Sequence, residues 1–247
     1  EIELQAGSPL GLLDFADRML EEIPFRIGAQ SKAERGYALA ARNAGGESGP
    51  VRARDIGLKG REDAHRAFAA IISETSGQVH ANESGFLTGD DPEYLHQMRV
   101  GLRRLRLALA LPRDEAWVEA SRPLRDRLRR LSRQLGEARN WDVFVHEILR
   151  PMLAHCGPQQ LAGLRVRAWR QRAAALAAAR QAVRSSETTR LWLDLARLMV
   201  SRGVAPDDVA GAGVLAAQSL DRHYRQLQAR LGDPDGTDRL HQLRISA

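Results

Sequence analysis

Most of the chain is a succession of amphipathic helical segments separated by short turns, and this pattern restricts the fold more than any other feature. Between residues 92 and 111, leucine and methionine side chains recur at the three- and four-residue spacing of one helix face. The breaks between segments carry turn chemistry, as in "LTGDDP", "HCGP" and "GDPDG". The sequence therefore predicts an all-α fold of antiparallel helical bundles. Its helices are expected at 61–86, 92–111, 114–137, 140–155, 159–184, 187–202, 207–231 and from about residue 236 onward.

The first 42 residues differ from the rest in pattern. "EIELQAG" is typical of a short strand, and Ser8 followed by Pro9 favours the start of a helix. "SKAERGYAL" is expected to be a second extended segment. The Gly-rich stretch "NAGGESGP" then predicts a linker over residues 43–60 and a domain boundary before the helical region.

Positive charge is concentrated in the middle of the chain. From His96 to Arg190 there are 20 arginines, no lysine and 8 acidic residues, a net charge of +12, whereas the remainder carries −6. Such a concentration is expected of a region that binds anions. The excess of arginine over lysine is typical of a GC-rich genome, and arginine also suits bidentate phosphate contacts.

Two of the predicted helices carry a cationic stripe beside an apolar one. At about 100° per residue, the basic side chains of each helix share one face, and leucines occupy the neighbouring face. Adjacent stripes could form a cationic groove bridged by a chain of phosphates. The alternative is a solvated charged face, but the first stripe lacks the acidic residues that would pair at i,i+4. The stripe residues are His96, Arg99, Arg103 and Arg106 on the first helix and Arg122, Arg125, Arg129 and Arg133 on the second.

One six-residue motif occurs twice. "LHQMRV" at Leu95–Val100 returns as "LHQLRI" at Leu240–Ile245, and both copies follow an Asp- and Pro-containing turn. We interpret this as two related halves, of about 61–155 and 159–247. His241 and Arg244 then correspond to His96 and Arg99.

The stretch "GEARNWDVF" is expected to be a corner between two helices. Gly136 would end one helix, and Asn140 or Asp142 would begin the next. We expect Arg139 and Asp142 to pair and hold this corner.

Other classes of site find little support. The single cysteine, Cys156, allows no internal disulfide and fits a reducing compartment. The seven histidines show no pair at ligand spacing, so no metal site is expected in the helical region. The apolar run "AAALAAA" is too short to cross a bilayer, so no membrane partner and a cytoplasmic location are predicted.

"HQMRVGLRRLR", "LRRLSRQLGEARNWDV" and the second "HQLRI" resemble the CHAD (conserved histidine α-helical) domain over roughly residues 61–247. The resemblance implies two pseudo-symmetric four-helix bundles and a basic groove that binds inorganic polyphosphate, in the cytoplasm and on polyphosphate granules. It assigns this role to His96, to the two arginine stripes, and to His241 and Arg244. Asn140 stands where the family usually has Asp, and helices that complete the second bundle would follow Ala247, so that bundle is expected to be incomplete.

Residues 1–42 resemble the end of a CYTH (triphosphate tunnel) domain, so the chain is expected to be truncated at both ends. The resemblance implies that Glu1 and Glu3 help to hold a divalent cation in an intact tunnel. A full-length parent could then be a metal-dependent inorganic triphosphatase with the helical region as its accessory domain. We expect no hydrolysis by this fragment and no cofactor in its helical domain.

Nucleic acid is the alternative partner, because the same stripes could bind a phosphodiester backbone. Aromatic residues are only 5% of the chain, which leaves few platforms for base stacking. Polyphosphate is therefore the first expectation, and nonspecific binding of a nucleic-acid backbone the second.

Overall fold

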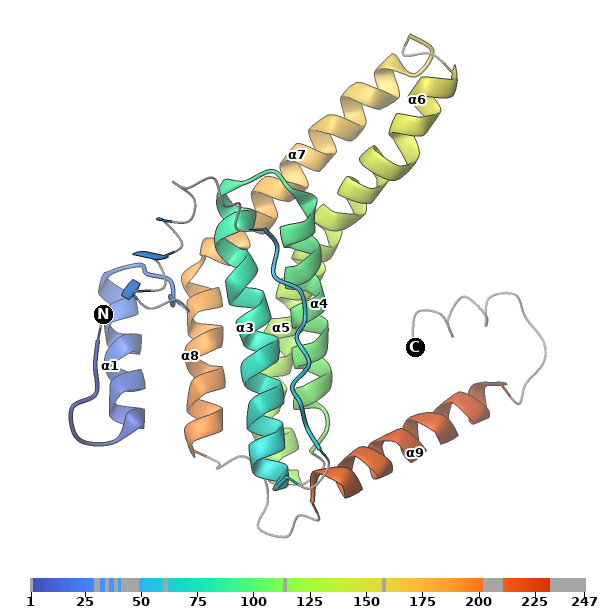
Figure 1. Ribbon diagram of the computed structural model, residues 1–247. Helices are drawn as coiled ribbons and strands as arrows, with labels where there is room; N and C mark the ends of the chain where they lie inside the picture. The colour runs from blue at the N-terminus through green and yellow to red at the C-terminus, as the bar shows by residue number, and fades with distance from the viewer. Residues whose placement is uncertain are drawn as a thin grey trace.

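In a computed structural model, the described residues are helical or irregular and include no strand (Figure 1). They are 2–28, 32–33, 36–37, 40, 49–59, 62–112, 115–156, 159–201 and 211–231. The all-α prediction is confirmed over them. The main elements are α1 (Pro9–Glu22), α3 (Ala64–Thr88), α4 (Pro92–Leu109), α5 (Glu115–Val143), the π-helix η1 (Phe144–Leu149), α6 (Arg150–Cys156), α7 (Ala162–Arg184), α8 (Ser186–Ser201) and α9 (Ala212–Leu231).

The main hydrophobic core lies between α3, α4, α5 and α8 (Figure 1). The leucine face of α4 is fully buried at Leu102, Leu105 and Leu109, and it meets Leu128 and Leu135 of α5. Burying each such side chain stabilises the fold by roughly 1.5–3 kcal/mol. These apolar faces therefore fix the rotation of α4 and α5 about their own axes. The arginine stripe of each helix is thereby kept out of the core.

This core also crosses the boundary expected between the two halves of the chain. Ala179 and Val183 of α7 and Leu191 and Leu195 of α8 belong to the same cluster as the α3–α5 residues. Segments on both sides of residue 155 therefore share one core. A pair of pseudo-symmetric bundles stays a prediction.

The corner predicted near Gly136 is wrong. The chain remains helical from Glu115 through η1 to Cys156, with Gly136 buried inside α5. A mid-helix glycine costs about 1 kcal/mol relative to alanine, which packing can offset. Arg139 pairs with Glu147 at 3.3 Å, and Asp142 pairs with Arg172 of α7 at 2.6 Å. Asp142 lies only three residues beyond Arg139, but its carboxylate binds Arg172 of α7, and Arg139 pairs with Glu147 of η1 instead.

The second half of α5, η1 and α6 run beside α7 and form an arm that extends from the bundle (Figure 1). The arm has a small core of its own at Val145, Leu149 and Ala168. The Asp142–Arg172 ion pair lies at its base, and the Asp142 side chain is only 1% exposed. The arm is therefore continuous with the bundle through α5, and the Asp142–Arg172 pair holds its two sides together.

The N-terminal helix packs on the bundle. Ser8 caps α1 by accepting a hydrogen bond from the Leu10 amide, as its sequence indicates. Ala16 and Leu20 of α1 form a small core with Leu193 of α8. The contact holds α1 against the helical region.

Two expectations for the first 42 residues are wrong. Residues 2–5 form no strand, because no neighbouring strand is present among the described residues to form a ladder. The described residues of "SKAERGYAL" are helical. Glu3 is exposed, and Glu1 lies outside the described residues.

The predicted linker is tied to α3 where it is described. The backbone of Val51 exchanges two hydrogen bonds with the Asn82 side chain, at 2.9 and 2.8 Å. The Arg54 amide donates to Glu74. Residues 49–59 thus run along the bundle.

His241, Arg244 and the helix expected near residue 236 lie outside the described residues. None of the helices in the described part of the chain combines the length and apolar character that a membrane span requires.

Candidate anion-binding face

The two predicted cationic stripes lie along the packed pair α4 and α5. Because the leucines of both helices are buried against each other, the basic side chains beside them lie at the edge of the α4–α5 contact. We call this set the basic face; its members are His96, Arg99, Arg103, Arg106, Arg122, Arg125, Arg129 and Arg133.

Arg99 joins the two helices. Its half-buried guanidinium donates to the backbone carbonyl of Ser132 on α5, at 3.4 Å. A Cβ placed on Gly136 would come within 2.4 Å of the Arg99 Nη1 atom, so the glycine leaves room for this side chain. Burial lowers the pKa of Arg99 below its usual value, and the charge of Arg139 lowers it further. Two cations from different helices are therefore held close together.

A second cross-helix pair of cations lies toward the other end of α4. Burial lowers the pKa of Arg106, and the charge of Arg129 on α5 adds to the effect. Between these pairs Arg103 is exposed. Like charges held together in partly desolvated positions raise the local positive potential, which an anion would relieve.

Most of the basic face has no acidic partner. Within the described residues, six members form no ion pair with a carboxylate: His96, Arg99, Arg103, Arg106, Arg125 and Arg133. Arg122 and Arg129 pair with Glu119 and Asp126 on their own helix, in exposed positions. Exposed pairs of this kind contribute roughly 0–1 kcal/mol, so a polyanion can compete for both arginines.

Sequence reasoning missed Arg139 as a member of this region. The interpretation of "GEARNWDVF" as a corner placed Arg139 in a turn, whereas it lies one helical turn beyond Gly136, next to Arg99. The signal was present, since Arg125, Arg129, Ser132, Gly136 and Arg139 follow three- and four-residue spacing along α5.

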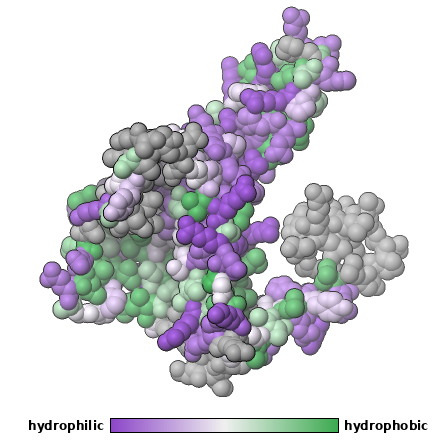
Figure 2. Space-filling view, viewed as in Figure 1, coloured by the Kyte–Doolittle hydropathy of each residue, from purple (hydrophilic) through white to green (hydrophobic). Residues whose placement is uncertain are grey.

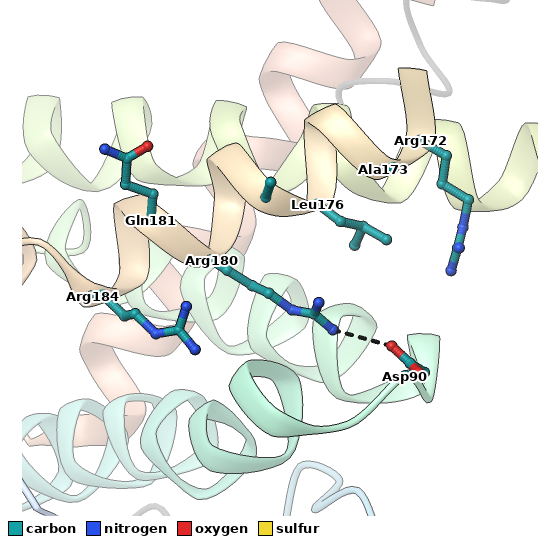
Figure 3. A pocket seen from close by; sticks show the side chains of 8 residues that line it. Asp90, Arg172, Ala173, Leu176, Arg180, Gln181 and Arg184 are labelled. Atoms are coloured by element: carbon teal, nitrogen blue, oxygen red, sulfur yellow. Dashed lines mark hydrogen bonds and ion pairs between the residues drawn. The ribbon is translucent and has the colours of Figure 1, made fainter. Parts of the chain in front are cut away.

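A second group of arginines lines a cavity of about 500 Å³ between α7 and the turn after α3 (Figure 3). Arg180 donates to the carbonyls of Phe86 and Gly89, and Arg184 donates to Leu87. Arg180 also reaches Asp90 at 3.4 Å. These contacts satisfy carbonyl groups at the C-terminal end of α3, so both arginines act chiefly as caps.

The chemistry available on the basic face is therefore binding by charge-assisted hydrogen bonds. Among the described residues, no group of three His, Cys, Asp or Glu side chains is placed to hold a metal ion.

Comparisons with known proteins identify the family to which this fold corresponds. The family model described as the CHAD domain matches residues 70–247. The crystal structure of the CHAD domain from the plant Ricinus communis superimposes with a TM-score of 0.67 at 31% sequence identity. The match covers 81% of this chain and 67% of that chain. No curated protein matches the sequence significantly.

Proposed function

The chain belongs to the CHAD domain family, and from that premise we propose that its basic face binds inorganic polyphosphate. The observation that carries the proposal is the set of arginines along α4 and α5 that have no acidic partner among the described residues. Burial, and then the charges of Arg139 and Arg129, lower the pKa values of Arg99 and Arg106. The family's association with polyphosphate selects this ligand among anions. A cytoplasmic location, including polyphosphate granules, belongs to the same proposal.

Polyphosphate suits the face because it is a flexible chain with a negative charge at each unit. One such chain can contact α4 and α5 simultaneously and neutralise arginines that repel each other. Each phosphate contact releases counterions, so binding should weaken with salt, with a slope of about −0.7 per contact for a single-stranded polyanion.

A nucleic-acid backbone is the second candidate, because the basic face would attract any linear phosphate polymer. Aromatic residues make up only 5% of the chain, and the face itself carries none, which disfavours recognition by base stacking. A role beside a triphosphatase domain is compatible with polyphosphate binding, with the helical region recruiting substrate for the parent protein.

The test is binding of labelled long-chain polyphosphate over a salt series, beside double-stranded DNA and sulfate. The variant Arg99→Glu/Arg103→Glu should reduce affinity for polyphosphate by about 100-fold or more, since each reversal replaces attraction by repulsion. The matched control is Arg66→Glu/Arg222→Glu, which reverses two arginines outside the face that have no ion pair among the described residues.

Circular dichroism would establish that both double variants are folded. A preference for polyphosphate that is lost only in the first variant supports the proposal. Equal affinity for DNA, or equal losses in both variants, would make the face a generic cationic surface.

A further inference from the structure

The long helix that leaves the bundle contains a π-helical turn, η1, within the arm. Such turns are rare, and they occur often at functional sites because they re-aim side chains within a helix. Here the turn carries His146, a half-buried histidine that forms no hydrogen bond with any described residue.

Cations surround His146 from every element packed against the turn. Arg139 comes from α5, Arg150 from α6 and Arg172 from α7. Burial lowers the pKa of His146, and these three arginines lower it further, whereas Asp142 acts in the opposite direction. The potential at the imidazole is therefore positive overall.

The two nearby acids are already engaged. Asp142 is buried and bound to Arg172 at 2.6 Å, and Glu147 pairs with Arg139 at 3.3 Å. The Arg150 side chain is exposed and has no ion pair within the described residues. His146 and Arg150 are thus the groups of this cluster that remain available to a ligand.

The cluster continues the basic face. Arg139 influences both Arg99 on one side and His146 on the other, so it links the two regions. Arg139 precedes His146 on the continuous helical path from α5 into η1, and its charge acts on the His146 imidazole. From Arg129 to Arg150 the continuous helical path is about 30 Å long at roughly 1.5 Å per residue.

We propose that His146 and Arg150, with Arg139, form a second anion subsite that extends the basic face along the arm and binds later phosphates of a long chain. This inference rests on the proposed function and adds two properties to it. Affinity depends on chain length, because only a long chain reaches both regions. Affinity also rises at lower pH, because a bound phosphate stabilises the protonated imidazole.

The experiment compares His146→Asn/Arg150→Gln with the control His155→Asn/Arg66→Gln, which replaces an exposed histidine and an exposed arginine outside the subsite. The probes are tripolyphosphate, a short oligophosphate fraction and a long-chain fraction. Each is measured over a salt series at about pH 7.5 and about pH 5.5, on either side of the ordinary histidine pKa.

The first variant should lose about threefold to tenfold in affinity for the long chain, and its salt slope should be shallower by about 0.7 per lost contact. Binding of tripolyphosphate should be unchanged, and the control should resemble the wild type. The gain in long-chain affinity at low pH should be smaller in His146→Asn than in the wild type.

Equal losses for tripolyphosphate and long chains, or no loss at all, would overturn the subsite while leaving polyphosphate binding intact. If the wild type does not prefer polyphosphate over double-stranded DNA in the test of the proposed function, that function fails, and the subsite fails with it.

Discussion

Two arginine-rich regions of this molecule place the same side chain in different surroundings. Between α1 and α8, Arg197 donates to Asp14 and Asp17 and also pairs with Asp194, and the hydrogen bond with Asp17 raises its pKa. On the basic face, Arg99 has no acidic partner among the described residues, and burial with Arg139 nearby lowers its pKa. The first region is neutralised within the fold, whereas the charge of the second fits the anion-binding role proposed for it.

The difference shows that the number of arginines says little about their use. The distribution of carboxylates decides it, because a paired arginine stabilises the fold and an unpaired one raises the potential at the surface. Substitutions of arginines in the first region should therefore change mainly the stability of the fold, and substitutions in the second mainly the affinity for polyphosphate.

The largest effect on stability is expected for Arg172→Met. The change leaves the Asp142 carboxylate buried without its partner, which should lower the free energy of unfolding by about 3 kcal/mol or more. Thermal unfolding measures this loss. Unchanged stability would show that Asp142 is solvated or protonated in the folded protein.

The α1–α8 region is tested by Arg197→Gln. Removal of the partly exposed ion pairs with Asp14, Asp17 and Asp194 should cost about 1–2 kcal/mol of stability. Affinity for polyphosphate at a temperature where the variant is folded should equal that of the wild type. A loss of affinity would show that the α1–α8 region also contributes to polyphosphate binding.

Gly136→Ala tests whether the position of Arg99 on the basic face affects binding. The added methyl group would displace the flexible end of Arg99, while alanine is favoured over glycine in a helix by about 1 kcal/mol. We expect unchanged or higher thermal stability with about threefold weaker polyphosphate binding. Ser132→Ala is a suitable control, because Arg99 contacts only its backbone carbonyl. Equal affinity in the glycine variant and this control would indicate that the position of Arg99 is not important.

The smallest effects on stability are expected for Arg122→Gln and Arg129→Gln. Both side chains are more than half exposed and pair only with acids on their own helix, so stability should change by no more than about 0.5 kcal/mol. The salt slope of polyphosphate binding should be shallower by about 0.7 in each variant. An unchanged slope would place these two arginines outside the contact.

Local periodicity by itself determined the helices and the two cationic stripes. The leucine spacing of residues 92–109 specifies both a helix and its buried face, and the arginine positions on the neighbouring face follow from the same geometry. The CHAD resemblance was readable for the same reason, since its motifs are short and contiguous.

Only the tertiary structure decided which arginines are free. Arg197 meets Asp14 across 183 residues of sequence, and Arg127 meets Asp194 across 67, so no local spacing could reveal these partners. The helix also continues through Gly136 and Asn140, where local signals favoured a turn, and there Arg99 lies over Gly136 and Asp142 pairs with Arg172 of α7. Local sequence placed the charges on the helices, and long-range packing determined which of them remain unneutralised.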